Sequence, residues 1–219
     1  DTSTSMLSED IPPTRLEASK QAAKTFVETV PPKTNLGFVT FHSNAFVITP
    51  ITRDKEIILE GIGGVEERIT GATDLGEAIT TSTNQLIDEK GLRSIILLSD
   101  GADTSISKLQ EDISYASKQN VLIHTIKVGT SEGGYIEALN LSLPGSADNE
   151  TLIEISEKTN GVYFESVDQE QLEQAFAEIA GTEETNIPVD LTFTFILGSL
   201  LLLFILWTWL YNKYRTTPQ

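Results

Sequence analysis

The sequence contains no cysteine and little positive charge. The absence of cysteine among 219 residues excludes disulfides, thiolate zinc sites and cysteine nucleophiles. Only 15 Lys and Arg residues stand against 32 Asp and Glu, so the formal net charge is −17, and the basic residues form no run. Because such a chain repels phosphate backbones, we expect no binding to nucleic acid.

The apolar content is nevertheless that of a packed body. Hydrophobic residues make up 39% of the chain and aromatic residues 7%, which excludes an acidic disordered chain. The length fits one medium domain with an appendage. We expect four parts, namely a folded domain over 1–180, an acidic linker over 181–190, a transmembrane helix over 191–211 and a tail over 212–219.

The membrane segment is predicted from one uncharged run, LTFTFILGSLLLLFILWTWL, which covers Leu191 to Leu210. About 20 such residues are needed to cross a bilayer as a helix, and the Trp and Tyr residues at its end are typical of the headgroup level. Lys213 and Arg215 follow the run, whereas the preceding segment is acidic. The positive-inside rule therefore predicts a cytoplasmic tail and an extracytoplasmic body, anchored through Leu191 to Tyr211.

In the body, apolar runs alternate with amphipathic stretches, which predicts an α/β fold with helices on both faces of a sheet. We expect it to be doubly wound and mostly parallel, with one antiparallel edge strand where a hairpin turns at His42-Ser43-Asn44. The predicted strands are Leu36–Phe41, Ala45–Ile48, Ser94–Ser99, Val121–Val128 and Gly161–Phe164. A sheet of this kind needs a strand that ends at the first loop, so we also expect a hydrophobic strand upstream of Asp1.

Helices are predicted where apolar residues recur at helical spacing between Pro, Asp or Gly boundaries. These segments are 15–30, 74–89, 106–118, 149–158 and 169–179, with Asp168 as the N-cap of the last. The stretch 131–148 contains two adjacent glycines and a Pro-Gly pair, so we expect a surface loop there.

Oxygen-bearing side chains follow several predicted strands. Asp1, Ser3 and Ser5 alternate in the opening residues, so an extended loop turns all three towards one side. Thr73 precedes a predicted helix, and Asp100 directly follows the buried strand ILLS. Ligands of open α/β sheets gather outside the carboxyl ends of the strands, where these loops meet. The pattern predicts a site for a hard cation.

These residues resemble the von Willebrand factor A domain family, whose metal-ion-dependent adhesion site (MIDAS) combines an Asp-x-Ser-x-Ser loop with a later Thr and Asp. Asp1, Ser3, Ser5, Thr73 and Asp100 fall on the five motif positions, within the strings DTSTSM, GATDLGEAI and LLSDG. The resemblance covers nearly the whole body and implies a Rossmann-like fold. The stretch SMLSEDIPPTRLEASKQAAKTF and the C-terminal span further resemble prokaryotic membrane-anchored members associated with aerotolerance operons.

The donor set suits Mg²⁺ first, or Mn²⁺ or Ca²⁺, because all five groups are oxygens and neither His42 nor His124 lies near a motif. Both histidines are interpreted as structural. The resemblance implies that Ser3, Ser5 and Thr73 act as direct or near-direct ligands, with the two aspartates partly through water. It further implies an open position for the acidic side chain of a protein partner, within a hetero-oligomeric membrane complex.

Two other functions stay open at this point. The body could be a structural subunit of an ATPase-linked membrane assembly, with a dispensable metal site. A Mg²⁺-dependent phosphohydrolase with Asp1 as nucleophile is disfavoured, because Ser3 stands where such enzymes carry a second Asp and no phosphate-binding loop is present. We therefore expect a binding module and not an enzyme.

Overall fold

The computed structural model describes residues 1–66, 72–101, 106–130, 133–136, 139–143, 149–185, 199–200, 202–204 and 206–209. These fall into two units, one over Asp1–Thr185 and one over Asn186–Gln219. The helices of the first unit are η1 (Thr4–Leu7), α1 (Arg15–Thr29), α2 (Lys55–Gly63), α3 (Leu75–Leu86), α4 (Ile106–Lys118), α5 (Glu150–Lys158) and α6 (Gln169–Thr185). Its strands are β1 (Leu36–Phe41), β2 (Ala45–Thr52), β3 (Ser94–Ser99), β4 (Leu122–Val128), β5 (Gly134–Ile136), β6 (Leu141–Leu143) and β7 (Tyr163–Ser166).

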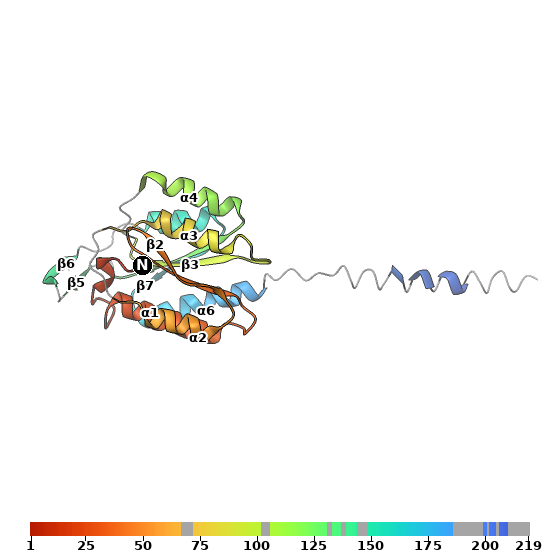
Figure 1. Cartoon of the computed structure of the whole chain (residues 1–219), viewed down its shortest axis with the longest axis horizontal. Helices are drawn as coiled ribbons and strands as arrows, with labels where there is room; N and C mark the ends of the chain where they lie inside the picture. Colours follow the sequence, from red (N-terminus) through yellow and green to blue (C-terminus); the bar gives the residue numbers. More distant parts are fainter. Residues whose placement is uncertain are drawn as a thin grey trace, which may run out of the picture. The chain divides into compact units, whose positions relative to one another are not determined.

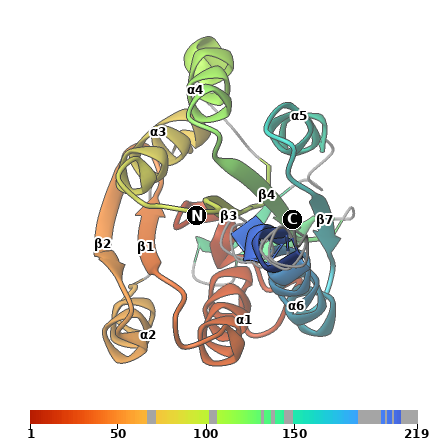
Figure 2. The ribbon, with the colours of Figure 1, turned by 90° about the vertical axis from the view of Figure 1, so that its right-hand side faces the viewer.

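The first unit is a sheet between two layers of helices, as predicted (Figure 1, Figure 2). Strands β3, β4 and β7 pair in parallel in one three-stranded sheet, and β1 and β2 pair antiparallel in a separate two-stranded sheet. Helices α3, α4 and α5 cover one face, and α1, α2 and α6 cover the other (Figure 2). The α/β class and the parallel sheet are therefore confirmed; the predicted hairpin is present, but its two strands form a sheet of their own and not an edge of the parallel one.

Each face of the sheet carries its own apolar core, because successive side chains of a strand point to opposite sides. On β3, Ile95 and Leu97 belong to the core beneath α3 and α4, while Ile96 and Leu98 pack against the core beneath α1 and α6. On β4, Ile126 is fully buried in the second core. The prediction that this part of the sheet is covered on both faces is confirmed.

Asp1 and Thr2 connect the two groups of strands at one end of the sheet. The backbone N–H of Thr2 donates to the Phe41 carbonyl at the end of β1, at 2.8 Å. The amino group of Asp1 donates to the Leu98 carbonyl of β3, at 3.2 Å. The opening residues therefore lie between β1 and β3, at the end of the sheet where the predicted site loops meet.

Helix α1 begins where its sequence predicts. The Thr14 hydroxyl accepts a hydrogen bond from the Glu17 N–H at 3.2 Å, which satisfies one of the unpaired donors of the first turn. Asp168 caps α6 in the same way, since its carboxylate accepts from the Gln171 N–H at 2.8 Å. That capping prediction is confirmed.

Helix α2 was not predicted from the sequence. It contains two glycines, which lower helix propensity, but Asp54 caps it and Ile58 and Ile62 are buried beneath it. Gly61 is required by close packing, because a Cβ there would lie 2.5 Å from the Thr49 hydroxyl of β2. Because close packing against the hairpin requires glycine at this position, the helix propensity of the segment is low and the sequence only weakly indicates a helix.

Several predicted boundaries are corrected by the structure. Strand β2 continues to Thr52 and not only to Ile48, and helix α3 ends at Leu86 and not at residue 89. The segment 131–148 is not only a loop, because β5 and β6 form a short antiparallel hairpin within its described residues. Strand β7 begins at Tyr163 and not at Gly161, where a Cβ would lie 1.9 Å from the Ile123 carbonyl oxygen. Helix α6 continues to Thr185, so the predicted linker 181–190 begins inside a helix.

The second unit includes part of the predicted membrane segment. Its described residues are helical at 199–200, 202–204 and 206–209, and the other positions of the predicted span lie outside the described residues. Among the residues that the structure describes, no helix is long and apolar enough to cross a membrane. The described apolar side chains, from Leu200 to Trp209, are 56–68% exposed.

Candidate metal site

The opening loop folds back on the Asp1 carboxylate. Asp1 Oδ1 accepts a hydrogen bond from the Ser3 N–H at 2.8 Å, and the Ser3 and Ser5 hydroxyl oxygens lie 3.0 Å apart. The 3₁₀ helix η1 starts at Thr4 and brings Ser5 back towards Ser3. Ser3 is only 3% exposed. The three predicted oxygen donors of this loop therefore lie together.

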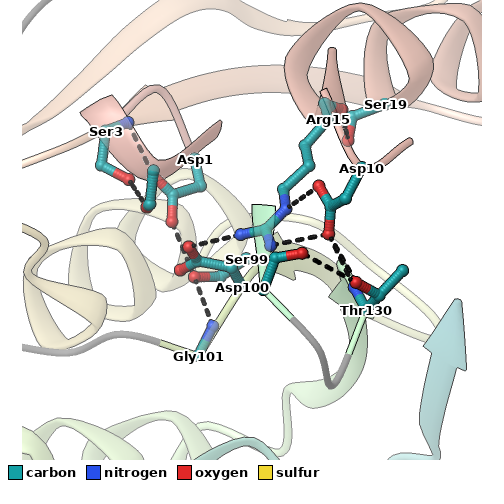
Figure 3. A network of polar contacts seen from close by, with 11 residues as sticks. Asp1, Ser3, Asp10, Arg15, Ser19, Ser99, Asp100, Gly101 and Thr130 are labelled. Atoms are coloured by element: carbon teal, nitrogen blue, oxygen red, sulfur yellow. Dashed lines mark hydrogen bonds and ion pairs between the residues drawn. The ribbon is translucent and has the colours of Figure 1, made fainter. Parts of the chain in front are cut away.

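The end of β3 joins the same cluster (Figure 3). The Ser99 hydroxyl donates to Asp1 Oδ2 at 2.6 Å, and the Gly101 N–H donates to the Ser99 hydroxyl at 3.3 Å. Asp100 lies between these two residues and is 2% exposed. Gly101 has φ +84°, a conformation that favours glycine, so the chain can turn sharply after the carboxylate.

Thr73 reaches this end of the sheet through the β1–β2 turn. The N–H of the next residue, Asp74, donates to the His42 carbonyl at 2.8 Å, one residue after the Phe41 carbonyl that holds Thr2. Asp74 also caps α3 by accepting from the Glu77 N–H at 3.0 Å. Thr73 is 3% exposed. Its position is therefore fixed at the start of a helix, beside the strand end that anchors the opening loop.

An arginine also contacts the cluster. Arg15 Nη1 donates to Asp100 Oδ2 at 3.1 Å, and its Nε and Nη2 donate to the two Asp10 oxygens at 2.7 and 2.8 Å (Figure 3). The Thr130 N–H, at the end of β4, donates to Asp10 Oδ2 at 2.8 Å. The Arg15 guanidinium therefore links α1 directly to Asp100 after β3, and through Asp10 to Thr130 after β4.

This network keeps Asp10 ionised. Burial favours the neutral carboxyl, but the hydrogen bonds from Arg15 and from the Thr130 N–H favour the anion more strongly. Together they lower the pKa of Asp10 from 3.8 to about 2. At neutral pH the cluster therefore contains a charged Asp10–Arg15 pair next to Asp100.

The two histidines make structural contacts and are not among these oxygen donors. The Nδ1 of His124 accepts the Val162 N–H at 3.2 Å, and burial lowers the pKa of His124 below its ordinary value. A neutral imidazole that pairs with a backbone N–H between β4 and β7 fits a structural role. His42 Nδ1 accepts the N–H of Ser43 at 2.7 Å within the hairpin turn.

The donor chemistry fits a hard divalent cation. Two carboxylates and three hydroxyls come from buried or half-buried loops, and oxygen ligands of this kind suit Mg²⁺, Mn²⁺ and Ca²⁺. The described residues include no group of three or more His, Asp or Glu side chains arranged to hold a metal. That finding concerns a different ligand set, because three of the five predicted donors here are hydroxyls.

Comparison with known proteins agrees with the geometry. Residues 1–102 match the family model of the von Willebrand factor type A domain. The matched residues, which contain all five motif positions, belong to a von Willebrand factor type A domain. The aerotolerance-related membrane protein from Bacteroides fragilis has a similar fold, with a TM-score of 0.73 at 21% identity over 83% of this chain and 96% of that one.

Two further proteins are similar to this von Willebrand factor A domain. A UPF0353 protein of Mycolicibacterium paratuberculosis is 30% identical over 194 residues, which cover 82% of this chain. This chain spans about 57% of the length of that relative. Proximal thread matrix protein 1 from the mussel byssus, solved with a zinc-occupied MIDAS motif, has a TM-score of 0.59 at 22% identity over 79% of this chain and 42% of that one.

Three residues of the cluster were missed by sequence reasoning. The sequence places Ser99 only at the end of a predicted strand, and Asp10 only within the stretch SMLSEDIPPTRLEASKQAAKTF. Arg15 did leave a signal, because a cation in the first turn of a helix opposes the helix dipole and so calls for another explanation. The structure supplies one in its contacts with Asp10 and Asp100.

Proposed function

We propose that this von Willebrand factor A domain binds a protein partner through a divalent cation held by Asp1, Ser3, Ser5, Thr73 and Asp100. The observation that carries the proposal is the contact between the two motif loops. The Ser99 hydroxyl donates to the Asp1 carboxylate at 2.6 Å, and Asp100 follows Ser99 directly in the chain. A single Asp, Ser or Thr at such a position is often an ordinary helix cap. Several oxygen donors that lie together at one end of the strands are instead typical of a cation site.

The electrostatics favour an acidic group on the partner. With a formal net charge of −17, the domain repels carboxylates in general. A bound dication reverses the local field over roughly the 8 Å that physiological salt leaves unscreened. A Glu or Asp from the partner then completes the coordination, and the same carboxylate is rejected wherever the metal is absent.

Mg²⁺ is our proposed ion, with Mn²⁺ or Ca²⁺ as substitutes. The mussel protein was solved with zinc at its MIDAS motif, so a motif of this kind can hold a divalent ion. The all-oxygen donor set of this chain favours harder ions, because zinc prefers nitrogen and sulfur ligands.

We further propose that the domain is tethered outside a membrane by residues 191–211, with 212–219 in the cytoplasm. The support is the uncharged sequence of this run, the strongly exposed apolar side chains of its described residues and the similarity of the domain to an aerotolerance-related membrane protein. Protease added outside intact cells should remove the domain and leave a tag on the C-terminus protected. Loss of the tag instead would contradict this topology.

A binding role fits the Asp1 carboxylate better than a catalytic one. Both of its oxygens accept hydrogen bonds from within the chain, from the Ser3 N–H and the Ser99 hydroxyl. Such bonds orient a ligand or support a metal, and they lower the nucleophilicity that a phosphohydrolase would need. Turnover of a phosphoester that requires Mg²⁺ and disappears in Asp1→Asn would overturn this assignment.

Capture of a partner tests the proposal directly. Full-length protein in detergent, immobilised through its C-terminus, is exposed to membrane extract of the source cells in Mg²⁺ or in chelator. Proteins that need both the metal and Asp100, as judged with Asp100→Ala, are the expected partners. Ser114→Ala is a matched surface control, because this exposed hydroxyl donates to the Gln110 carbonyl within α4. Capture that is indifferent to metal and to Asp100 would instead indicate a structural subunit with a dispensable site.

A further inference from the structure

The position of Arg15 is not explained by the fold or by the motif. Its side chain is 2% exposed, although it belongs to the first turn of α1, where a positive charge opposes the helix dipole. Burying a guanidinium also removes it from water, which is unfavourable unless its donors are paired. Three of its nitrogens pair with carboxylate oxygens of Asp10 and Asp100. Arg15 is therefore placed for the site and not for the helix.

Two neighbours hold the guanidinium in place. Asp10 accepts from two of its nitrogens, and the same carboxylate is fixed by the Thr130 N–H. Gly129, with φ +131°, lies directly against it, and a Cβ there would lie 2.7–2.8 Å from three guanidinium atoms. The positive charge therefore cannot swing away from Asp100 in the way a surface arginine would.

The charges around the site differ by one with and without this residue. Asp1, Asp100 and Asp10 carry three negative charges, and Arg15 carries one positive charge, so the group sums to −2. Asp100 is one of the two carboxylates available to a metal, and Arg15 partly neutralises its charge from 3.1 Å away. A fixed positive charge this close opposes the binding of a second cation.

We propose that Arg15 is a built-in counter-cation of Asp100 that lowers the affinity of the site for divalent metal. The inference rests on the proposed metal site and deepens it. When the affinity for metal is low, one more ligand from the partner raises it the most. Metal and partner carboxylate therefore bind cooperatively, and the metal is retained chiefly in the complex. The opposite role, in which Arg15 orients Asp100 for the metal, predicts the opposite sign for its removal.

The test is a charge series measured by isothermal titration calorimetry with Mg²⁺ and with Mn²⁺, on full-length protein in detergent. Arg15→Gln removes the counter-cation and is expected to tighten metal binding about tenfold or more, because an opposing charge close to the ion is lost. Asp10→Asn leaves the whole charge of Arg15 to Asp100 and is expected to weaken binding. Arg15→Lys retains the charge without the fork and is expected to stay within about threefold of the wild type.

Matched controls separate this local effect from total charge. Lys20→Gln and Glu17→Gln change the net charge by the same amounts as the two test variants, on the same helix. Lys20 and Glu17 pair with each other at 2.6 Å. Both controls are expected to bind metal within about twofold of the wild type, because Lys20 bonds to Glu17 and to the Val65 carbonyl and not to Asp10 or Asp100. Thermal unfolding in chelator reports the folded state of every variant without metal.

The outcomes distinguish the two proposals. Wild type that binds metal while Arg15→Gln binds it equally or more weakly overturns the counter-cation, but leaves the proposed function standing. Absence of metal binding in the wild type and in every variant overturns both. If Arg15→Gln does not unfold cooperatively, Arg15→Met decides, because it also removes the charge and must bind metal more tightly than the wild type.

Discussion

Replacing Asp10 by asparagine removes the anion that anchors Arg15 and changes no other charge. The Asp10 side chain is 7% exposed and pairs with both Arg15 and the Thr130 N–H. The amide must turn an NH₂ group towards one of these donors, so at least one existing hydrogen bond is lost. We expect a less stable domain in the absence of metal, with no change of fold.

The size of the effect follows from the pKa of Asp10, which folding lowers from 3.8 to about 2. One pKa unit corresponds to about 1.4 kcal/mol, so the ionised carboxylate contributes about 2.5 kcal/mol to the free energy of unfolding at neutral pH. Because the folded pKa is the lower one, this stability is present above pH 3.8 and is lost as the pH falls through about 2. About half of it remains at pH 3. The lost hydrogen bond in the variant brings the expected total to about 3–5 kcal/mol.

Urea denaturation in chelator, followed by circular dichroism, measures this difference at pH 7 and at pH 3. The gap between wild type and Asp10→Asn should shrink by about 1 kcal/mol at the lower pH, because the wild type loses the charge that the variant lacks. Asp88→Asn, at an exposed aspartate, is the matched control and should change stability by less than about 0.5 kcal/mol. A gap that is below 1 kcal/mol at pH 7, or equal at both pH values, would refute the role given to Asp10.

Three further predictions test other parts of the domain. Ser3→Ala combined with Ser5→Ala should abolish the rise in melting temperature that Mg²⁺ gives the wild type, which corresponds to about 2.7 kcal/mol at 100 times Kd; an equal rise in both would exclude these hydroxyls as ligands. Thr14→Ala should lower the free energy of unfolding by about 1 kcal/mol through loss of the α1 cap, with Thr14→Ser close to wild type in the same urea titration. Ile126→Ala should cost about 2–5 kcal/mol, since this side chain is fully buried, and a loss below 1 kcal/mol would contradict its place in the core.

The parts of the fold that sequence predicts well are those with a strong local pattern. Strands β1 and β3 and helix α4 have the predicted bounds, because apolar periodicity and turn residues agree there. Helix α2 and the β5–β6 hairpin could not be predicted in the same way. Gly61 is needed for contact with Thr49, and Gly134 lies where a Cβ would overlap the Ser8 hydroxyl, so distant residues determine both glycines. Local propensity contains no record of such contacts.

For the site, the sequence indicates which oxygen donors lie together, but not which positive charge compensates the carboxylates. The spacing of Asp1, Ser3 and Ser5 predicts a common side, and the structure brings their loop to Asp100 through Ser99. The ion pair of Arg15 with Asp100 spans 85 residues of sequence. No periodicity links two such positions, and the only local trace is an unfavourable charge at a helix start. That the five oxygens bind a metal stays a prediction.

The central claim is that these oxygens hold one divalent cation, and direct titration with Mn²⁺ tests it most simply. Electron paramagnetic resonance counts free Mn²⁺ as it is added to full-length protein in detergent, with Asp100→Ala and Asp88→Asn in parallel. The account predicts one bound ion per chain in the wild type and in Asp88→Asn, with binding lost in Asp100→Ala and displaced by Mg²⁺ in the wild type. Equal binding by all three proteins, or none by the wild type, would contradict it.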